Sequence, residues 1–134
     1  MTDAARPNVV VVLVDDMGYG DLGLFNEGRS RTPHLDALAA EGVCLTQCYS
    51  GSPVCAPSRA TLLTGRYPQR MNITDWIPGR PNRADQRLLQ PKIRNELPLE
   101  EVTIAEALKA HGYTTAKIGK RHLGSRGFDP ARQA

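Results

Sequence analysis

The chain has 134 residues, of which 40% are hydrophobic and 23% are charged. This composition is typical of a soluble globular protein and argues against a disordered or fibrous one. The net charge of +3 comes without a basic block or basic residues interleaved with aromatic ones, so we expect no nucleic-acid partner. The only long apolar run, Val9 to Val14, is shorter than the roughly 20 residues that span a bilayer, so we expect no membrane partner either.

The cysteine count and the amino-terminal residues bear on the compartment. Three cysteines are an odd number, which argues against a closed disulfide framework and favours a reducing compartment. No basic segment precedes the apolar run, so the sequence predicts no signal peptide. We expect a cytoplasmic protein, or a periplasmic or secreted one if a leader has been trimmed.

The first predicted element is a buried strand over residues 8–14. This run is mostly valine and is flanked by polar residues, a pattern typical of a central strand of a parallel sheet. Asp15 and Asp16 follow directly, so their carboxylates should project at the carboxyl edge of the sheet. Ligands of open α/β sheets bind at that edge.

A helix and a second strand should come next. Thr32 is a suitable N-cap, Pro33 a suitable first helical residue, and Gly42 a suitable stop. Residues 43–49 then predict a strand, 50–57 a loop and 58–63 a helix whose amino end points at the site.

The remaining elements follow a long irregular stretch. Residues 66–98 carry five prolines and little periodicity, and we interpret them as a long surface excursion. Thr103 should cap another helix that ends at Gly112, and residues 113–118 predict a third strand. The expected fold class is therefore α/β, with a mostly parallel sheet flanked by helices.

The segment that begins at Cys55 carries the strongest functional signal. Its sequence Cys-Ala-Pro-Ser-Arg, with Thr64-Gly65 closing the apolar turn that follows, resembles the first signature of the sulfatases. In that family the matching cysteine is oxidised to a formylglycine aldehyde by a formylglycine-generating enzyme. The resemblance implies a sulfuric ester hydrolase, with Arg59 helping to organise the modified residue. Arg59 stands one helical turn after Cys55, and the alternative for it is a surface arginine.

The chemistry of sulfate transfer explains why such a residue is useful. An ordinary serine or cysteine would trap the sulfuryl group in a second stable ester, and covalent catalysis helps only if the second step is also easy. A hydrated aldehyde avoids this problem. One hydroxyl attacks sulfur, and loss of a proton from the other releases sulfate by carbon–oxygen cleavage.

A second segment, Gly112 to Gly124, is similar to the second sulfatase signature. There the lysine matching Lys120 contacts the substrate sulfate, and the histidine matching His122 hydrogen-bonds the diol. A cation neutralises sulfate charge and a histidine shuttles protons near neutral pH, so both residue types suit these roles. Arg121 stands where the family usually has an aromatic residue. The alternative is a basic loop after an edge strand.

The two aspartates suggest a metal site. Adjacent carboxylates at a strand end suit Ca²⁺, and Mg²⁺ less well, although a solvated strand-to-loop junction is the alternative. The sequence from Asp15 to Gly23 resembles the sulfatase segment whose two aspartates bind calcium. The resemblance implies a site formed by Asp15, Asp16 and an oxygen of the modified Cys55.

Other readings of the sequence remain open. Cys44, Cys48 and Cys55, with or without His34, could be written as a zinc site, but the spacing is loose. Cys44 and Cys48 fit better as small core residues on one face of a strand. The site could also serve a phosphoester or phosphonate-ester hydrolase of the same alkaline phosphatase superfamily.

The resemblance runs from Pro7 to Gly124 and corresponds to the amino-terminal portion of a sulfatase. It implies an alkaline-phosphatase-like fold that is incomplete in this chain, with residues 1–134 forming the first part of a catalytic domain. Asp15, Asp16 and position 55 are too few for the six to eight oxygen ligands of Ca²⁺. We therefore expect a truncated chain with weak or no activity alone, or an inactive fragment that folds only with a partner, such as a missing carboxyl-terminal portion.

Overall fold

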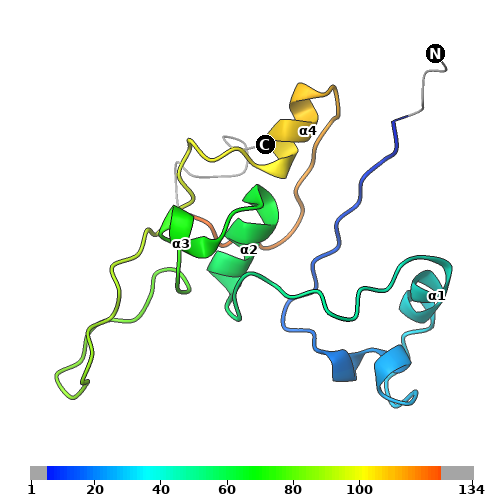
Figure 1. Ribbon diagram of the computed structural model, residues 1–134, viewed down its shortest axis with the longest axis horizontal. Coiled ribbons are helices and arrows are strands. Elements are labelled where there is room, and N and C mark those ends of the chain that lie inside the picture. Colours follow the sequence, from blue (N-terminus) through cyan, green and yellow to red (C-terminus); the bar gives the residue numbers. More distant parts are fainter. Residues whose placement is uncertain (1–5, 125–134) are drawn as a thin grey trace. The chain divides into compact units, whose positions relative to one another are not determined.

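The computed structural model describes residues 6–124 and divides the chain into two compact units. Their described parts are residues 6–47 and residues 48–124. Figure 1 shows and labels the α-helices of both units. None of the helices between residues 6 and 124 is long and apolar enough to cross a membrane.

The first unit is organised around one α-helix and two 3-10 turns. Its elements are η1 (Tyr19–Asp21), η2 (Gly23–Phe25) and α1 (Pro33–Glu41). The helix has the predicted bounds, with proline at its start and Gly42 as its C-cap. The Tyr19 and Phe25 rings pack edge to face with centroids 4.9 Å apart, a favourable aromatic geometry.

The start of α1 is tied to η2 through side chains. Thr32 precedes the helix, but its hydroxyl accepts a hydrogen bond from the Gly23 amide (2.8 Å) and donates to Asp36 Oδ1 (2.9 Å). A Cβ at position 23 would lie 2.7 Å from Asp36 Oδ2 and 2.8 Å from the Ser30 carbonyl oxygen. Only glycine allows this close approach.

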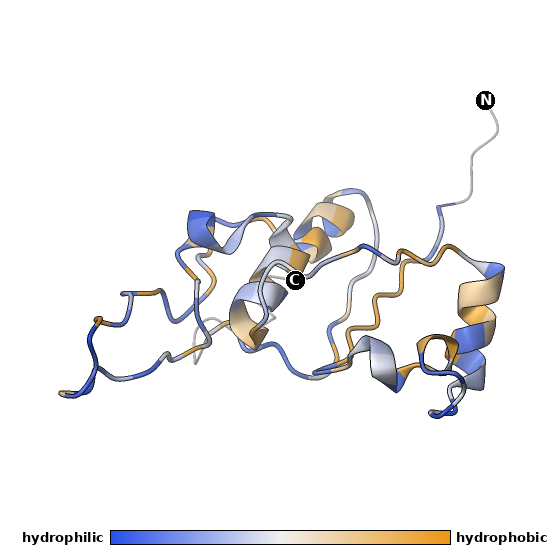
Figure 2. Ribbon diagram, turned by 60° about the horizontal axis from the view of Figure 1, so that its bottom comes forward, coloured by the Kyte–Doolittle hydropathy of each residue, from blue (hydrophilic) through white to orange (hydrophobic). Residues whose placement is uncertain are grey.

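The predicted strands at 8–14, 43–49 and 113–118 are not formed in the described part of the chain. These segments have no ladder partner, and a strand needs a neighbour to accept and donate its backbone hydrogen bonds. Their apolar side chains lie at the surface, with Val10 83%, Val43 87% and Ile118 93% exposed. Figure 2 shows residues 9–14 as an orange, apolar segment. The structure therefore does not confirm the sheet.

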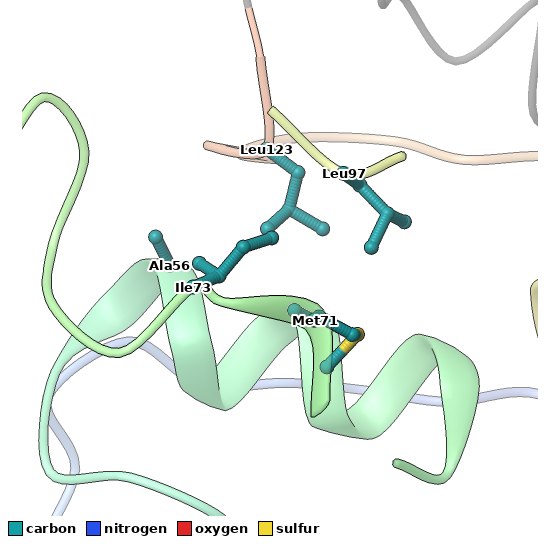
Figure 3. Close-up of a cluster of buried hydrophobic side chains, with 6 residues drawn as sticks. Ala56, Met71, Ile73, Leu97 and Leu123 are labelled. Atoms are coloured by element: carbon teal, nitrogen blue, oxygen red, sulfur yellow. The ribbon is translucent and has the colours of Figure 1, made fainter. Parts of the chain in front are cut away.

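The second unit holds the buried core of the described chain. Its helices are α2 (Cys55–Thr64), α3 (Pro68–Met71) and α4 (Ile104–Ala110). α2 contacts both of the others. Figure 3 shows the core side chains facing one another beside α2. The buried apolar residues are Ala56, Ala60, Met71, Ile73, Leu97 and Leu123.

Local signals define the ends of the helices in this unit. α4 begins with a capping box, in which the Thr103 hydroxyl accepts from the Glu106 amide (3.3 Å) and Glu106 Oε2 accepts from the Thr103 amide (2.7 Å). It ends before Gly112, which has a φ of +81°, as the sequence predicted. α2 ends at Gly65, which adopts the left-handed conformation common at helix C-termini.

The segment 66–98 is only partly a surface excursion. Its ends contribute Met71, Ile73 and Leu97 to the core, and the Arg94 amide donates to the Asn72 carbonyl (2.8 Å), which closes the intervening loop. The exposed part is the stretch around residues 80–92. The prolines favoured the prediction of a surface loop, although apolar residues at both ends of the segment are buried in the core.

Candidate functional site

Cys55 is the first residue of helix α2. Val54 precedes it in an extended conformation and accepts the Ser58 amide at 3.2 Å. The predicted loop to residue 57 is therefore wrong, because the helix starts three residues before Ser58. Pro57 does not prevent this, since the first four amides of a helix have no intrahelical partner and proline lacks one. The free thiol of Cys55 is half-buried.

Arg59 lies one turn further along α2 and is buried, with 7% of its surface exposed. Its Nη1 donates to the backbone carbonyl of Lys120 at 2.6 Å, across 61 residues of sequence. The surface-arginine alternative is therefore wrong. A guanidinium donates up to five hydrogen bonds. The Arg59 side chain therefore connects helix α2, which begins at Cys55, with the loop of the second motif.

The Lys120 carbonyl accepts a second cationic donor. Lys117 Nζ lies 2.9 Å from the Lys120 oxygen and 3.3 Å from the Ile118 oxygen. Gly119 sits between them with a φ of +88°, a conformation that favours glycine. Lys120 itself is exposed. The sequence analysis did not predict this role of Lys117. The glycine between Lys117 and Lys120 was the available signal, because it allows a tight turn that brings the two residues together.

His122 is half-buried and belongs to the same loop. Its Nε2 lies 2.8 Å from the Ile77 carbonyl oxygen. Its Nδ1 is buried and makes no hydrogen bond within the described part of the chain. The next residue, Leu123, is fully buried, and its carbonyl accepts the Leu97 amide at 3.0 Å. The sequence does not predict this contact, because His122 and Ile77 lie 45 residues apart and the acceptor is a backbone carbonyl.

The second unit thus connects the four predicted catalytic residues through shared elements and a hydrogen bond. Cys55 and Arg59 share α2, and Arg59 is bonded to Lys120 in the loop that also carries His122. The core packs Ala56 and Ala60 of α2 with Leu123 of that loop. The two sequence motifs are therefore one structural unit around the start of α2.

The two aspartates belong to the first unit. Asp15 and Asp16 are exposed in a turn directly after the apolar run, and Asp16 has a φ of +59°, in the left-handed region that aspartate tolerates better than most residues. Between residues 6 and 124, no group of three or more His, Cys, Asp or Glu side chains could hold a metal ion. The predicted calcium site is therefore not assembled from these residues alone, and the pairing of the aspartates with position 55 stays a prediction.

The alternatives for the other cysteines are also decided by burial. Cys44 and Cys48 are exposed free thiols outside any strand, so their prediction as core residues is wrong. The absence of a metal-binding group among the described residues also removes support for the zinc reading.

Comparison with known proteins gives these motifs a family context. The sequence model of the family described as Sulfatase matches residues 7–131. Human arylsulfatase A is 50% identical over 121 residues, and human steryl-sulfatase is 46% identical over 121 residues; each alignment covers 90% of this chain. Rat N-acetylgalactosamine-6-sulfatase is 44% identical over the same length and share of the chain. The matches cover 20–22% of these relatives, so the chain spans about a fifth of their length.

Proposed function

Because this chain belongs to the sulfatase family, we propose that the protein to which it contributes hydrolyses sulfate monoesters at a site built around Cys55. Family membership also implies an alkaline-phosphatase-like α/β fold. The observation that carries the proposal is the link between the two motifs, in which Arg59 of the cysteine helix holds the Lys120 carbonyl.

The proposed nucleophile derives from Cys55. Oxidised to formylglycine by a formylglycine-generating enzyme, position 55 would supply a hydrated aldehyde, whose hydroxyls attack sulfur and later release sulfate. The place of Cys55 at the amino end of α2 favours negative charge nearby, because the helix dipole and unpaired amides are positive there. Arg59 adds a fixed cation within the same turn.

The residues of the second motif would handle charge and protons. Lys120 is exposed at its side chain, where its ammonium can meet a sulfate oxygen as charge develops. Its backbone is held by Arg59 and Lys117, which limits the positions that the side chain can reach. His122 would exchange a proton with a hydroxyl at position 55.

The donor chemistry of Asp15 and Asp16 fits a hard cation. Ca²⁺ and Mg²⁺ both bind carboxylate oxygens, but Mg²⁺ usually takes fewer ligands from the protein. Both carboxylates are exposed on a turn, so neither has to leave a buried environment to bind. We propose Ca²⁺ as the metal, bound by these two residues, an oxygen at position 55 and ligands from elsewhere in the protein. The ion would neutralise sulfate charge.

The test compares variants of the full-length protein, co-expressed with a formylglycine-generating enzyme. Cys55→Ala should lower hydrolysis of an aryl sulfate by about 10⁴-fold or more, the order of a lost nucleophile, whereas Cys48→Ala should leave it unchanged. Mass spectrometry of the peptide with residue 55 should show the aldehyde. Full activity of Cys55→Ala, or an unmodified thiol in an active enzyme, contradicts the proposal.

The same assay distinguishes sulfate ester hydrolysis from phosphoester or phosphonate-ester hydrolysis. A phosphoester or phosphonate-ester hydrolase would use the same residues, so the aryl phosphate and aryl sulfate are compared at matched concentration. A higher kcat/KM for the phosphate would assign the protein to that second function. The sulfatase proposal expects the sulfate to be preferred.

A further inference from the structure

The two ring nitrogens of His122 have different surroundings. Nε2 lies 2.8 Å from the Ile77 carbonyl oxygen, whereas Nδ1 is buried and has no hydrogen-bond partner in residues 6–124. A buried polar atom without a partner is costly. In addition, His122 has a φ of +56°, a strained backbone that is common where function fixes a side chain.

The Ile77 contact determines where the ring proton lies. A carbonyl oxygen only accepts hydrogen bonds, so Nε2 must carry the hydrogen. A neutral imidazole has one protonated nitrogen, and Nδ1 is then the one with a free lone pair. The ring is therefore set up to accept a hydrogen bond or a proton at Nδ1 and nowhere else.

A second histidine of the chain shows the opposite arrangement. His111 Nδ1 lies 2.8 Å from the Ala107 carbonyl oxygen, so by the same reasoning its Nδ1 carries the hydrogen. His34 is exposed, and no hydrogen bond of its ring is among those described for this part of the chain. The three histidines thus provide an internal comparison.

We propose that Ile77 is a positioning residue, whose backbone carbonyl holds His122 in the Nε2–H tautomer and so makes Nδ1 the atom that takes a proton from a hydroxyl at position 55. The identity of that hydroxyl rests on the proposed function; the tautomer does not. Segment 73–77 would thereby be part of the reaction machinery.

The packing around this segment supports the assignment. Ile73 is fully buried in the core, and Ile77 packs against that core. The loop that carries His122 is also held, because Leu123 is in the same core and the Lys120 carbonyl accepts a hydrogen bond from Arg59. Both partners of the His122–Ile77 hydrogen bond therefore lie on segments attached to the α2 core, which keeps the donor and the acceptor close together.

The proton transfer balances without any further reagent. The O–H bond of the hydroxyl breaks, an N–H bond forms at Nδ1, and the ring becomes an imidazolium with a hydrogen on each nitrogen. The positive charge then strengthens the existing bond from Nε2–H to the Ile77 oxygen, because charge-assisted hydrogen bonds are stronger than neutral ones. The carbonyl thus stabilises the protonated ring as well as orienting the neutral one.

The direct test is nitrogen NMR of the histidine rings in the ¹⁵N-labelled chain, at a pH where all three are neutral. We expect the Nε2–H tautomer at His122, the Nδ1–H tautomer at His111 and a tautomer mixture at His34. Single His→Gln variants assign the signals. An Nδ1–H tautomer or a mixture at His122, whatever the other two rings show, overturns the inference.

A pair of variants tests the Ile77 contact separately. In His122→Gln the side-chain amide can occupy the place of Nε2 and still donate to the Ile77 carbonyl. The side chain of His122→Asn is shorter, so its amide lies near the place of Nδ1 and cannot reach that carbonyl. Exchange of the Leu97 amide, which is bonded to the Leu123 carbonyl, reports on this region. We expect near wild-type exchange in His122→Gln and about tenfold faster exchange in His122→Asn, the effect of one lost hydrogen bond. Equal exchange in the two variants contradicts the positioning role.

Activity then distinguishes the two proposals. Both variants lack the proton acceptor and should lower aryl sulfate turnover about 10²–10⁴-fold, the usual contribution of a general base. If the wild-type protein does not hydrolyse sulfate esters, the proposed function fails while the tautomer result stands. If it does and His122→Gln keeps full turnover, Nδ1 is not the proton acceptor and the inference fails alone.

Discussion

Replacing Arg59 by methionine should destabilise the second unit, because the Arg59 guanidinium is the donor that joins α2 to the loop of the second motif. Methionine keeps most of the apolar stem of the side chain, so the substitution mainly removes the hydrogen bonds. A hydrogen bond from a charged donor contributes about 1.5–3 kcal/mol. Lys117 Nζ still donates to the same carbonyl at 2.9 Å, so we expect the lower end, about 1.5–2 kcal/mol.

The assay is urea unfolding followed by tryptophan fluorescence. Trp76 is the only tryptophan of the chain and is half-buried in the same unit. With a slope of about 1–3 kcal/mol per molar urea, the midpoint should fall by roughly 1 M. Arg87→Met is the matched control, since Arg87 is exposed in the loop around residues 80–92, and its midpoint should not move by more than a few tenths of 1 M.

A double variant makes the prediction sharper. Lys117→Met alone should have a small effect, because Lys117 is exposed and Arg59 still serves the shared carbonyl. Combined with Arg59→Met, it removes both cationic donors, and we expect an extra loss of about 1 kcal/mol beyond the sum of the single effects. If Arg59→Met behaves like Arg87→Met and the double variant is additive, the shared carbonyl does not connect the two motifs.

Three further substitutions probe the local structure around the site. Thr103→Ala removes the cap of α4 and should cost about 1 kcal/mol in the same urea assay; no change would mean that the capping box does not stabilise the helix. Leu97→Ala truncates a fully buried side chain and should cost about 2–5 kcal/mol, whereas the exposed Leu89, changed to alanine, should cost little; similar losses would contradict the described core. Gly65→Ala places a side chain at a φ of +67° and should cost about 1 kcal/mol, seen as a lower thermal midpoint by circular dichroism; an unchanged midpoint would exclude the left-handed C-cap.

The helices could be predicted where their end signals are local. Pro33 and Gly42 enclose α1, and Thr103 and Gly112 enclose α4, because such start and stop signals act within one turn. The start of α2 was missed for a reason of the same kind. The sequence prediction places Pro57 at the end of a loop, but proline is tolerated in the first turn of a helix, which allows the helix to begin at Cys55.

The strands could not be predicted in the same way. Residues 8–14 have the composition of a buried strand, but a pattern supplies only a preference for extended backbone. Pairing and burial come from other segments, and between residues 6 and 124 no segment pairs with this run. The burial of Met71 and Ile73 could not be predicted either, because they lie in a proline-rich stretch without hydrophobic periodicity.

The candidate site was predictable as a set of residues but not as an arrangement. Cys55, Arg59, Lys120 and His122 came from motif resemblance, and the structure adds the contacts of Arg59 with Lys120 and of His122 with Ile77. Those contacts join residues 45 and 61 positions apart, and in both the acceptor is a backbone carbonyl, which any residue type could provide. Side-chain identity therefore carries no signal for the role proposed for Ile77.

The exposed run at residues 8–14 has a consequence for handling the isolated chain. Six successive aliphatic side chains, without charge, proline or glycine, match the composition of segments that stack into cross-β fibrils. With Val10 and Val12 about four-fifths exposed, identical copies can interdigitate as a dry steric zipper. Substituting lysine for Val10 or Val12 would place a repelling charge at every 4.8 Å step of such a fibril, and would keep concentrated samples monomeric for the spectroscopy described above.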